Sequence, residues 1–84
     1  MPYSLKIKQS AFKEIQRLDK ADRKRLVEAI DNLTDNPHVG KLLKGEFSGL
    51  RRIRVGSFRV IYEINEGEVI VLILRIAPRN KGYR

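Results

Sequence analysis

The sequence predicts an α+β fold: a β-α-α-β-β-β chain whose helical hairpin packs on one face of a mainly antiparallel four-stranded sheet. Two observations support this prediction. The hydrophobic patterns along the chain follow the order strand, helix, helix, strand, strand, strand. The two helical segments are so close in sequence that they should fold back as an antiparallel pair, which leaves the other face of the sheet free. Because 84 residues allow one domain with a modest core, we treat residues 1–84 as a single unit.

The N-terminal half is expected to hold one strand and two helices. A short strand is expected at residues 3–8, where apolar and polar side chains alternate. Ser10 is expected to cap the first helix, whose apolar residues share one helical face up to Leu18. Asp19 is expected to cap a second, longer helix, which ends before Pro37.

Residues 50–62 predict a β-hairpin that carries a stripe of arginines. The dipeptide Gly56-Ser57 places glycine at the first central position, as a two-residue type II′ turn requires. This turn sets Arg54 opposite Arg59, and because side chains alternate along a strand, Arg52 shares their face. Like charges that face each other destabilise a sheet, so an anion lying across the stripe would explain it.

A last strand is expected at residues 68–76, which are rich in β-branched side chains and apolar on both faces. Such a strand is typical of the centre of a sheet. Pro78 ends it, and residues 79–84 form a short basic tail.

The positive charge is concentrated in the half of the chain that holds the hairpin. The net charge is +8, of which residues 1–40 contribute +2 and residues 41–84 contribute +6. This distribution favours nucleic acid as the partner over an acidic protein or an anionic membrane. No apolar stretch approaches the length of a secretory signal or a membrane span, so we expect a cytoplasmic protein with no membrane contact.

The sequence excludes several kinds of chemistry. It contains no cysteine, which rules out disulfides and thiolate nucleophiles. Its single histidine, His38, is expected to be a solvated loop residue, and one histidine cannot form a catalytic pair. The aspartates of the second helix lie along a solvated face rather than at metal-ligand spacing. We therefore expect no metal and no cofactor.

The hairpin sequence from Gly49 to Tyr62, GLRRIRVGSFRVIY, is preceded by KLLKG at residues 41–45 and followed by RNKGYR at residues 79–84. Together with the order of the elements, these motifs resemble the RelE/ParE toxin superfamily over essentially the whole chain. The resemblance implies a RelE-like, microbial ribonuclease-type fold and the toxin of a type II toxin–antitoxin pair. Toxins of the RelE branch are ribosome-dependent endoribonucleases, or mRNA interferases, which cut messenger RNA in the ribosomal A site and inhibit translation.

The same resemblance implies the partners of the protein. These are a cognate RelB-like antitoxin, expected to be a small acidic or amphipathic chain, together with the ribosome and messenger RNA. A toxin–antitoxin heterotetramer is an expected assembly. Segments that fold on binding can cover a large surface, which suits an antitoxin of this kind.

By motif position, the resemblance assigns catalytic roles to Arg52, Arg54, Arg59, Arg79 and Tyr83. Arginine keeps its proton, with a pKa above about 12, so the arginines would clamp phosphate rather than accept protons. Tyr83 is then the best candidate for the general base, because nearby positive charge lowers the pKa of a phenol. Lys81 is a weaker candidate for this role. RNA contacts are also expected from five further basic residues: Lys41, Lys44, Arg51, Lys81 and Arg84.

The sequence departs from the family pattern in two ways. The basic pair on the second strand is often lysine in the family and is Arg52 and Arg54 here, which removes the usual candidates for a base. Many bacterial members continue into a C-terminal helix that this sequence lacks, so we expect no inhibition by displacement of such a helix.

Two alternative functions are left open by the sequence. They are a ParE-like toxin that poisons DNA gyrase and a basic nucleic-acid-binding module without catalysis.

Overall fold

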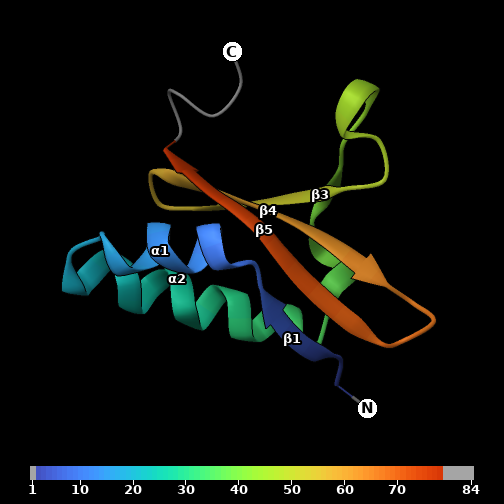
Figure 1. Cartoon of the computed structure of the whole chain (residues 1–84), viewed down its shortest axis with the longest axis horizontal. Coiled ribbons are helices and arrows are strands. Elements are labelled where there is room, and N and C mark those ends of the chain that lie inside the picture. The colour runs from blue at the N-terminus through green and yellow to red at the C-terminus, as the bar shows by residue number, and fades with distance from the viewer. Residues whose placement is uncertain (1, 79–84) are drawn as a thin grey trace.

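The computed structural model describes residues 2–78. Its elements, shown in Figure 1, are β1 (Ser4–Ile7), α1 (Gln9–Gln16), α2 (Lys20–Leu33), β2 (Lys41–Leu42), β3 (Arg51–Val55), β4 (Phe58–Asn65) and β5 (Ile70–Pro78). Two short 3-10 turns interrupt the segment between α2 and β3, namely η1 (Pro37–Val39) and η2 (Gly45–Phe47).

The sheet has five strands in the order β1-β5-β4-β3-β2. The strands β2 to β5 pair antiparallel with their neighbours, whereas β1 pairs parallel with β5, so the sheet is mixed. The predicted α+β class is confirmed, and β5 lies inside the sheet as expected. The fifth strand, β2, was not foreseen because two residues are too few to display an alternating pattern.

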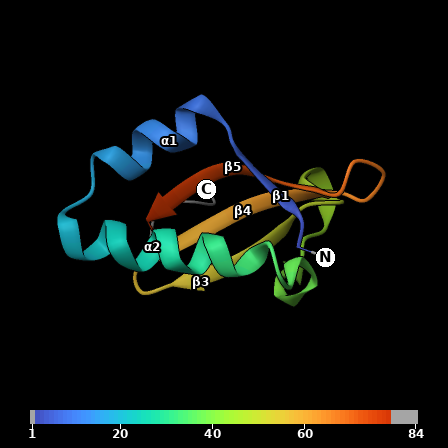
Figure 2. The same ribbon diagram turned by 90° about the horizontal axis from the view of Figure 1, so that it is seen from below.

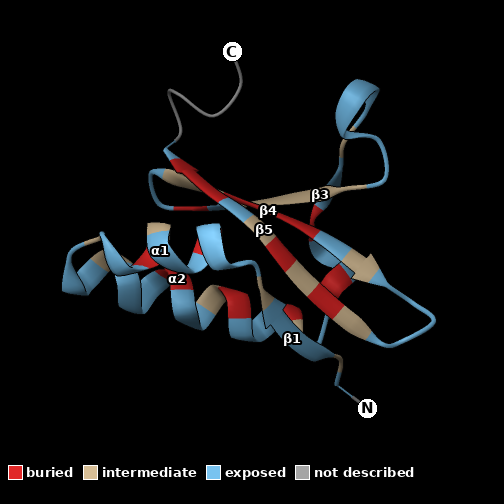
Figure 3. Ribbon diagram, viewed as in Figure 1, coloured by how far each residue is buried: buried red, intermediate tan, exposed pale blue. Residues whose placement is uncertain are grey.

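Both helices lie on the same side of the sheet (Figures 1 and 2). Their buried residues are spaced three or four apart, so each helix presents one apolar stripe to the strands. The stripes meet the inward side chains of β3, β4 and β5, and Figure 3 shows the buried residues gathered between these layers. Neither of the two described helices lies over the opposite face of the sheet.

One predicted helix cap is confirmed and the other is wrong. The Asp19 carboxylate accepts a hydrogen bond from the backbone N–H of Asp22 at 2.8 Å, as a cap of α2 should. Ser10 does not cap α1, because the helix starts at Gln9 and Lys8 occupies the cap position without a side-chain hydrogen bond. The chain passes almost directly from β1 into α1, so Ser10 already lies in the first turn of the helix.

The hairpin of β3 and β4 has the predicted register. Gly56 has a φ of +59°, which glycine adopts without strain, and Arg54 pairs with Arg59. A β-bulge follows between β4 and β5, where Ile61 pairs with Arg75 but Tyr62 pairs with Ile73. Leu74 is the extra residue, so the bulge reverses the alternation of side chains along β5. As a result, Ile73 and Ile76 both enter the core and Arg75 faces away from the helices.

Neither of the helices within residues 2–78 combines the length and the apolar character needed to cross a membrane.

Candidate functional site

Five cations lie close together in register on the sheet face opposite the helices, and we call them the arginine face: Lys41, Arg52, Arg54, Arg59 and Arg75. The strand register arranges them in two rows. The first row runs across four strands as Lys41, Arg52, Ile61 and Arg75. The second row runs across three strands as Arg54, Arg59 and Ala77. Beyond the first row, the next row of the same sheet face holds Glu63, Leu72 and Lys6. Residues that are paired in register project to the same side of a sheet, so the cations share one surface.

The cations surround buried apolar residues, and no described acidic residue stands in either of their two rows. Ile61 and Ala77, which lie between them in the two rows, are buried. Arg54 is exposed and Arg52 is half-buried, and neither forms a hydrogen bond or ion pair with another described residue. Direct opposition of Arg54 and Arg59 costs free energy that a bound anion would offset. The planar, forked guanidinium groups suit the paired oxygens of a phosphate.

Arg75 is a site residue that was not predicted from the sequence. By register it belongs to the first row of the arginine face, and its side chain is exposed. A signal was present in the sequence, since Arg75 is the only charged residue in β5. Simple alternation from Ile73 would have placed it in the core, and only the bulge at Leu74 turns it outward.

Two of the expected RNA-binding residues do not join the arginine face. Arg51 projects to the side that faces the helices, and its Nη1 atom donates hydrogen bonds to the backbone oxygens of Gly40 at 2.9 Å and His38 at 3.3 Å. Lys44 lies in the loop between β2 and β3, just before η2, where no strand register aligns it with the other cations. Lys41 does join the face, through its pairing with Arg52.

Four of the expected site residues lie outside the described part of the chain: Arg79, Lys81, Tyr83 and Arg84. The last described residue, Pro78, pairs with Phe58 and directly follows Ala77 in the second row.

Tyr62 is part of the core, as expected, and its phenol has a structural role. The hydroxyl donates to the backbone oxygen of Pro37 at 2.6 Å and accepts from the backbone N–H of Gly40 at 3.0 Å. Burial raises the pKa of Tyr62, and the Gly40 N–H and the Arg51 charge only partly oppose this shift. A Cβ atom at position 40 would collide with the Tyr62 side chain, which explains the glycine there. A buried, protonated phenol of this kind is not a general base.

The single histidine also lies away from the arginine face. His38 is exposed in η1, as expected, and its Nε2 atom lies 3.4 Å from Glu66. The hydroxyl of Tyr3 donates to the same carboxylate at 2.8 Å, and this hydrogen bond is the main reason that the pKa of Tyr3 is raised. These contacts join the N-terminus, η1 and the β4–β5 turn. Among residues 2–78, no three histidine or acidic side chains are grouped so that they could hold a metal ion.

Comparison with known proteins connects this geometry to one group of toxins. Residues 5–83 match the family of ParE toxins of type II toxin–antitoxin systems. The chain is 38% identical to toxin RelE of Mycobacterium tuberculosis, over 99% of this chain and 88% of that protein. Its fold is similar to the crystal structure of the toxin–antitoxin complex RelBE2 from Mycobacterium tuberculosis, with a TM-score of 0.87 and 30% identity over 94% of this chain and all of that one. It is also similar to the archaeal RelE–RelB complex from Pyrococcus horikoshii, with a TM-score of 0.79 and 34% identity over 98% of this chain and all of that one.

Proposed function

Because the chain belongs to the RelE/ParE family of type II toxin–antitoxin toxins, we propose that it is a ribosome-dependent endoribonuclease of the RelE type. In this proposal it cuts messenger RNA in the ribosomal A site and thereby inhibits translation. The observation that carries the proposal is the arginine face, which gathers cations in register on a sheet surface that neither α1 nor α2 covers.

The arginine face supplies charge stabilisation in the proposed reaction. Cleavage of RNA through its own 2′-hydroxyl builds negative charge on a pentacoordinate phosphorane, and preorganised donors lower the free energy of that state. We assign Arg52, Arg54 and Arg59 to this clamp, with Arg79 as a fourth member. Because guanidinium groups remain protonated, the clamp holds oxygens and does not take the proton from the 2′-hydroxyl.

We assign that proton transfer to Tyr83. Tyr62 is excluded because its hydroxyl is buried and both of its hydrogen bonds go to the backbone. Histidine is excluded because His38 pairs with Glu66 away from the arginine face. Lys81 is the second choice for the base.

The proposal includes a RelB-like antitoxin as the protein partner. Related toxins have been crystallised in complex with RelB antitoxin, in the Mycobacterium tuberculosis and Pyrococcus horikoshii structures described above. We propose that a cognate antitoxin of this kind binds the chain, suppresses its activity and assembles with it as a heterotetramer. Co-purification followed by a growth-rescue assay tests this partner, and toxicity that no such protein relieves would contradict it.

The proposed reaction is tested with purified protein and ribosomes carrying a defined message. Primer extension should reveal cuts at the codon in the A site, and the same message without ribosomes should stay intact. Plasmid supercoiling by DNA gyrase is the control for the ParE-like alternative. Inhibition of gyrase without any cleavage of ribosome-bound message would replace the RelE-type proposal by that alternative.

Substitution of Tyr83 separates proton transfer from binding. Tyr83→Phe keeps the ring but deletes the phenol, so the single-turnover rate should fall by about 10²–10⁴-fold with ribosome affinity nearly unchanged. The rising limb of the pH–rate profile should flatten in the same variant. Weaker binding with an unchanged rate in the bound state would make Tyr83 a docking residue and direct the search for the base to Lys81.

A further inference from the structure

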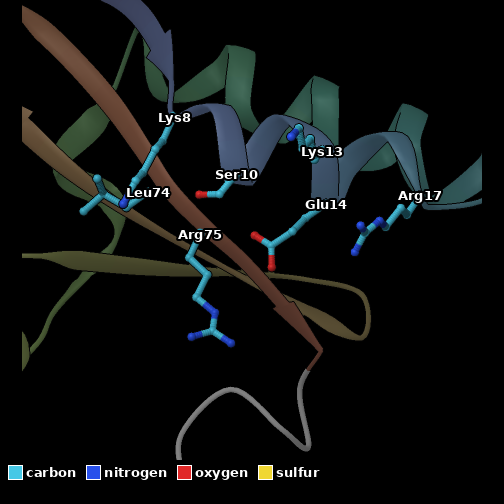
Figure 4. Close-up of a pocket in the computed structure, with 7 residues that line it drawn as sticks. All are labelled: Lys8, Ser10, Lys13, Glu14, Arg17, Leu74 and Arg75. Carbon is cyan, nitrogen blue, oxygen red and sulfur yellow. The ribbon is translucent and has the colours of Figure 1, made fainter.

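A basic groove lies between α1 and the C-terminal half of β5, beside the arginine face. β1 pairs with β5 only from Ile70 to Ile73, so the edge of β5 beyond Ile73 faces α1 instead of another strand. The groove has a volume of about 460 Å³. Figure 4 shows the residues that line it: Lys8, Ser10, Lys13, Glu14, Arg17, Leu74 and Arg75.

The groove carries an excess of positive charge that no ion pair within residues 2–78 neutralises. Its lining includes four cations and one carboxylate, a net charge of +3. The carboxylate belongs to Glu14, whose Oε1 atom accepts a hydrogen bond from the backbone N–H of Ile76 at 3.1 Å. None of the four cations forms an ion pair with another described residue.

Glu14 has a structural reason to be in the groove. The edge of β5 would otherwise expose the N–H of Ile76 for pairing with another chain, and the next residue on that edge, Pro78, has no N–H to offer. The carboxylate therefore closes the edge through a hydrogen bond that a neutral amide oxygen could also accept. Glu14 is therefore explained by its hydrogen bond to Ile76 and not by ion pairing with the cations of the groove. Those cations are available to bind a different anion.

The groove continues directly into the arginine face. Arg75 belongs to both, because it lines the groove and stands in the first row of the face. On α1, Ser10, Lys13 and Arg17 are spaced three and four residues apart, so they follow one side of the helix. From Lys8 to Arg17 this side is about 13.5 Å long at 1.5 Å per residue, enough to contact more than one phosphate along a strand.

The chemistry of the groove suits a nucleic-acid backbone better than a protein. Among the described residues that line it, Leu74 is the only one with an apolar side chain. Protein interfaces depend on buried apolar anchors at their centre, whereas phosphates are held by arginine, lysine and hydroxyl donors.

We propose that this groove binds the sugar–phosphate backbone of RNA adjacent to the phosphate held on the arginine face. The inference deepens the proposed function, on which it rests, by naming the surface that holds the RNA outside the reacting position. Lys8, Lys13 and Arg17 supply the charge, Ser10 supplies a hydroxyl donor, and Arg75 connects the two surfaces.

The proposal is tested by titrating the protein with fluorescent single-stranded RNA in two lengths, about 4 and about 20 nucleotides, which bracket the site sizes usual for such grooves. The variant K13Q/R17Q should bind the long RNA about 10-fold more weakly at low salt, with the salt slope reduced by about 1.4. Its affinity for the short RNA, which fits on the arginine face alone, should be almost unchanged. The matched control K20Q/K24Q removes the same charge from exposed positions on α2 and should change the long-RNA affinity much less.

Glu14→Gln should change the affinity for long RNA in the opposite direction. The glutamine oxygen keeps the hydrogen bond to Ile76 while the negative charge is lost, so the affinity for long RNA should rise by about 2- to 4-fold. A purely structural role for Glu14 predicts no such gain.

The outcomes distinguish this proposal from the proposed function. Equal losses in K13Q/R17Q and K20Q/K24Q would overturn it, because only the total charge would then matter. Loss of antitoxin binding in K13Q/R17Q with unchanged RNA affinity would also overturn it and make the groove a protein-docking surface. Failure of the wild type to cut messenger RNA would reject the proposed function alone, since the RNA affinities are measured without cleavage.

Discussion

Arg51 and Arg52 are neighbours on β3 but project to opposite faces of the sheet. On the face toward the helices, the Nη1 atom of Arg51 donates hydrogen bonds to the backbone oxygens of Gly40 and His38. On the free face, Arg52 and Arg54 form no hydrogen bond or ion pair with another described residue. An arginine on one face of the strand therefore holds the backbone of a neighbouring segment, whereas an arginine on the other face has hydrogen-bond donors available for an anion.

The environment of Arg51 is a closed polar cluster, which we define as Arg51, Tyr62, Pro37, His38 and Gly40. Within it the Tyr62 hydroxyl is bonded on both sides, and the backbone of the η1 segment is held against the sheet. On the arginine face, Arg52 and Arg54 are not enclosed in this way by the described residues. This comparison shows that the number of cations does not identify a binding surface, whereas the availability of their donors does.

Arg54→Ala should reduce the rate of cleavage without unfolding the protein. Loss of one preorganised donor to the developing phosphorane charge costs about 10²–10³-fold in rate, or roughly 3–4 kcal/mol. The free energy of unfolding should change by less than about 0.5 kcal/mol, because the side chain is exposed. Single-turnover cleavage and urea denaturation measure the two quantities. Arg51→Ala is the matched control and should show the reverse, a loss of stability with the bound-state rate retained.

Tyr62→Phe should destabilise the closed cluster. The buried oxygen of Pro37 and the N–H of Gly40 would each lose a partner, at a combined cost of about 2–3 kcal/mol in the free energy of unfolding. Urea denaturation measures this cost. Tyr3→Phe is the control, since its hydroxyl makes one exposed hydrogen bond to Glu66 and its removal should cost less than about 1 kcal/mol. Equal effects of the two substitutions would refute the special role of the cluster.

The closed cluster should also weaken at alkaline pH. The pKa of Tyr62 is raised in the folded protein, mainly by burial, so the unfolded chain releases this proton at lower pH. The contribution of Tyr62 to stability should be fully present below about pH 10 and be lost as the pH rises from there through the folded-state pKa. Denaturation midpoints of the wild type should therefore fall more steeply above that pH than those of Tyr62→Phe. Both proteins retain Tyr3, whose pKa is also raised, so its effect cancels.

The smallest expected effect is on the salt dependence of RNA binding. With about four phosphate contacts on single-stranded RNA, the slope of log K against log salt should be near −3, and Arg52→Ala should reduce its magnitude by about 0.7. Arg51→Ala should leave the slope unchanged, because the guanidinium of Arg51 is held by the protein. A slope near zero in the wild type would remove the arginine face from the account of binding.

Patterns within short segments of the sequence were sufficient to predict much of the fold and part of the site. The turn at Gly56 and the alternation of side chains predicted the pairing of Arg54 with Arg59, which the structure confirms. The cap at Asp19 follows from its own side chain and is also confirmed. The cap at Ser10 was wrong, because the start of α1 depends on where β1 ends. The catalytic assignment of Tyr83 stays a prediction, as does that of Arg79.

The sequence by itself therefore determined the order of the elements other than β2, the hairpin register and the concentration of positive charge in residues 41–84, since each depends on residues close together in the chain. Only the tertiary structure decided which cations act together. The bulge at Leu74 turned Arg75 toward the free face, and the backbone of η1 took up the donors of Arg51. The end of β1 at Ile7 exposed the edge of β5 to α1 and so formed the basic groove. These three results arise from contacts between segments far apart in sequence, and no local pattern of residues encodes such contacts.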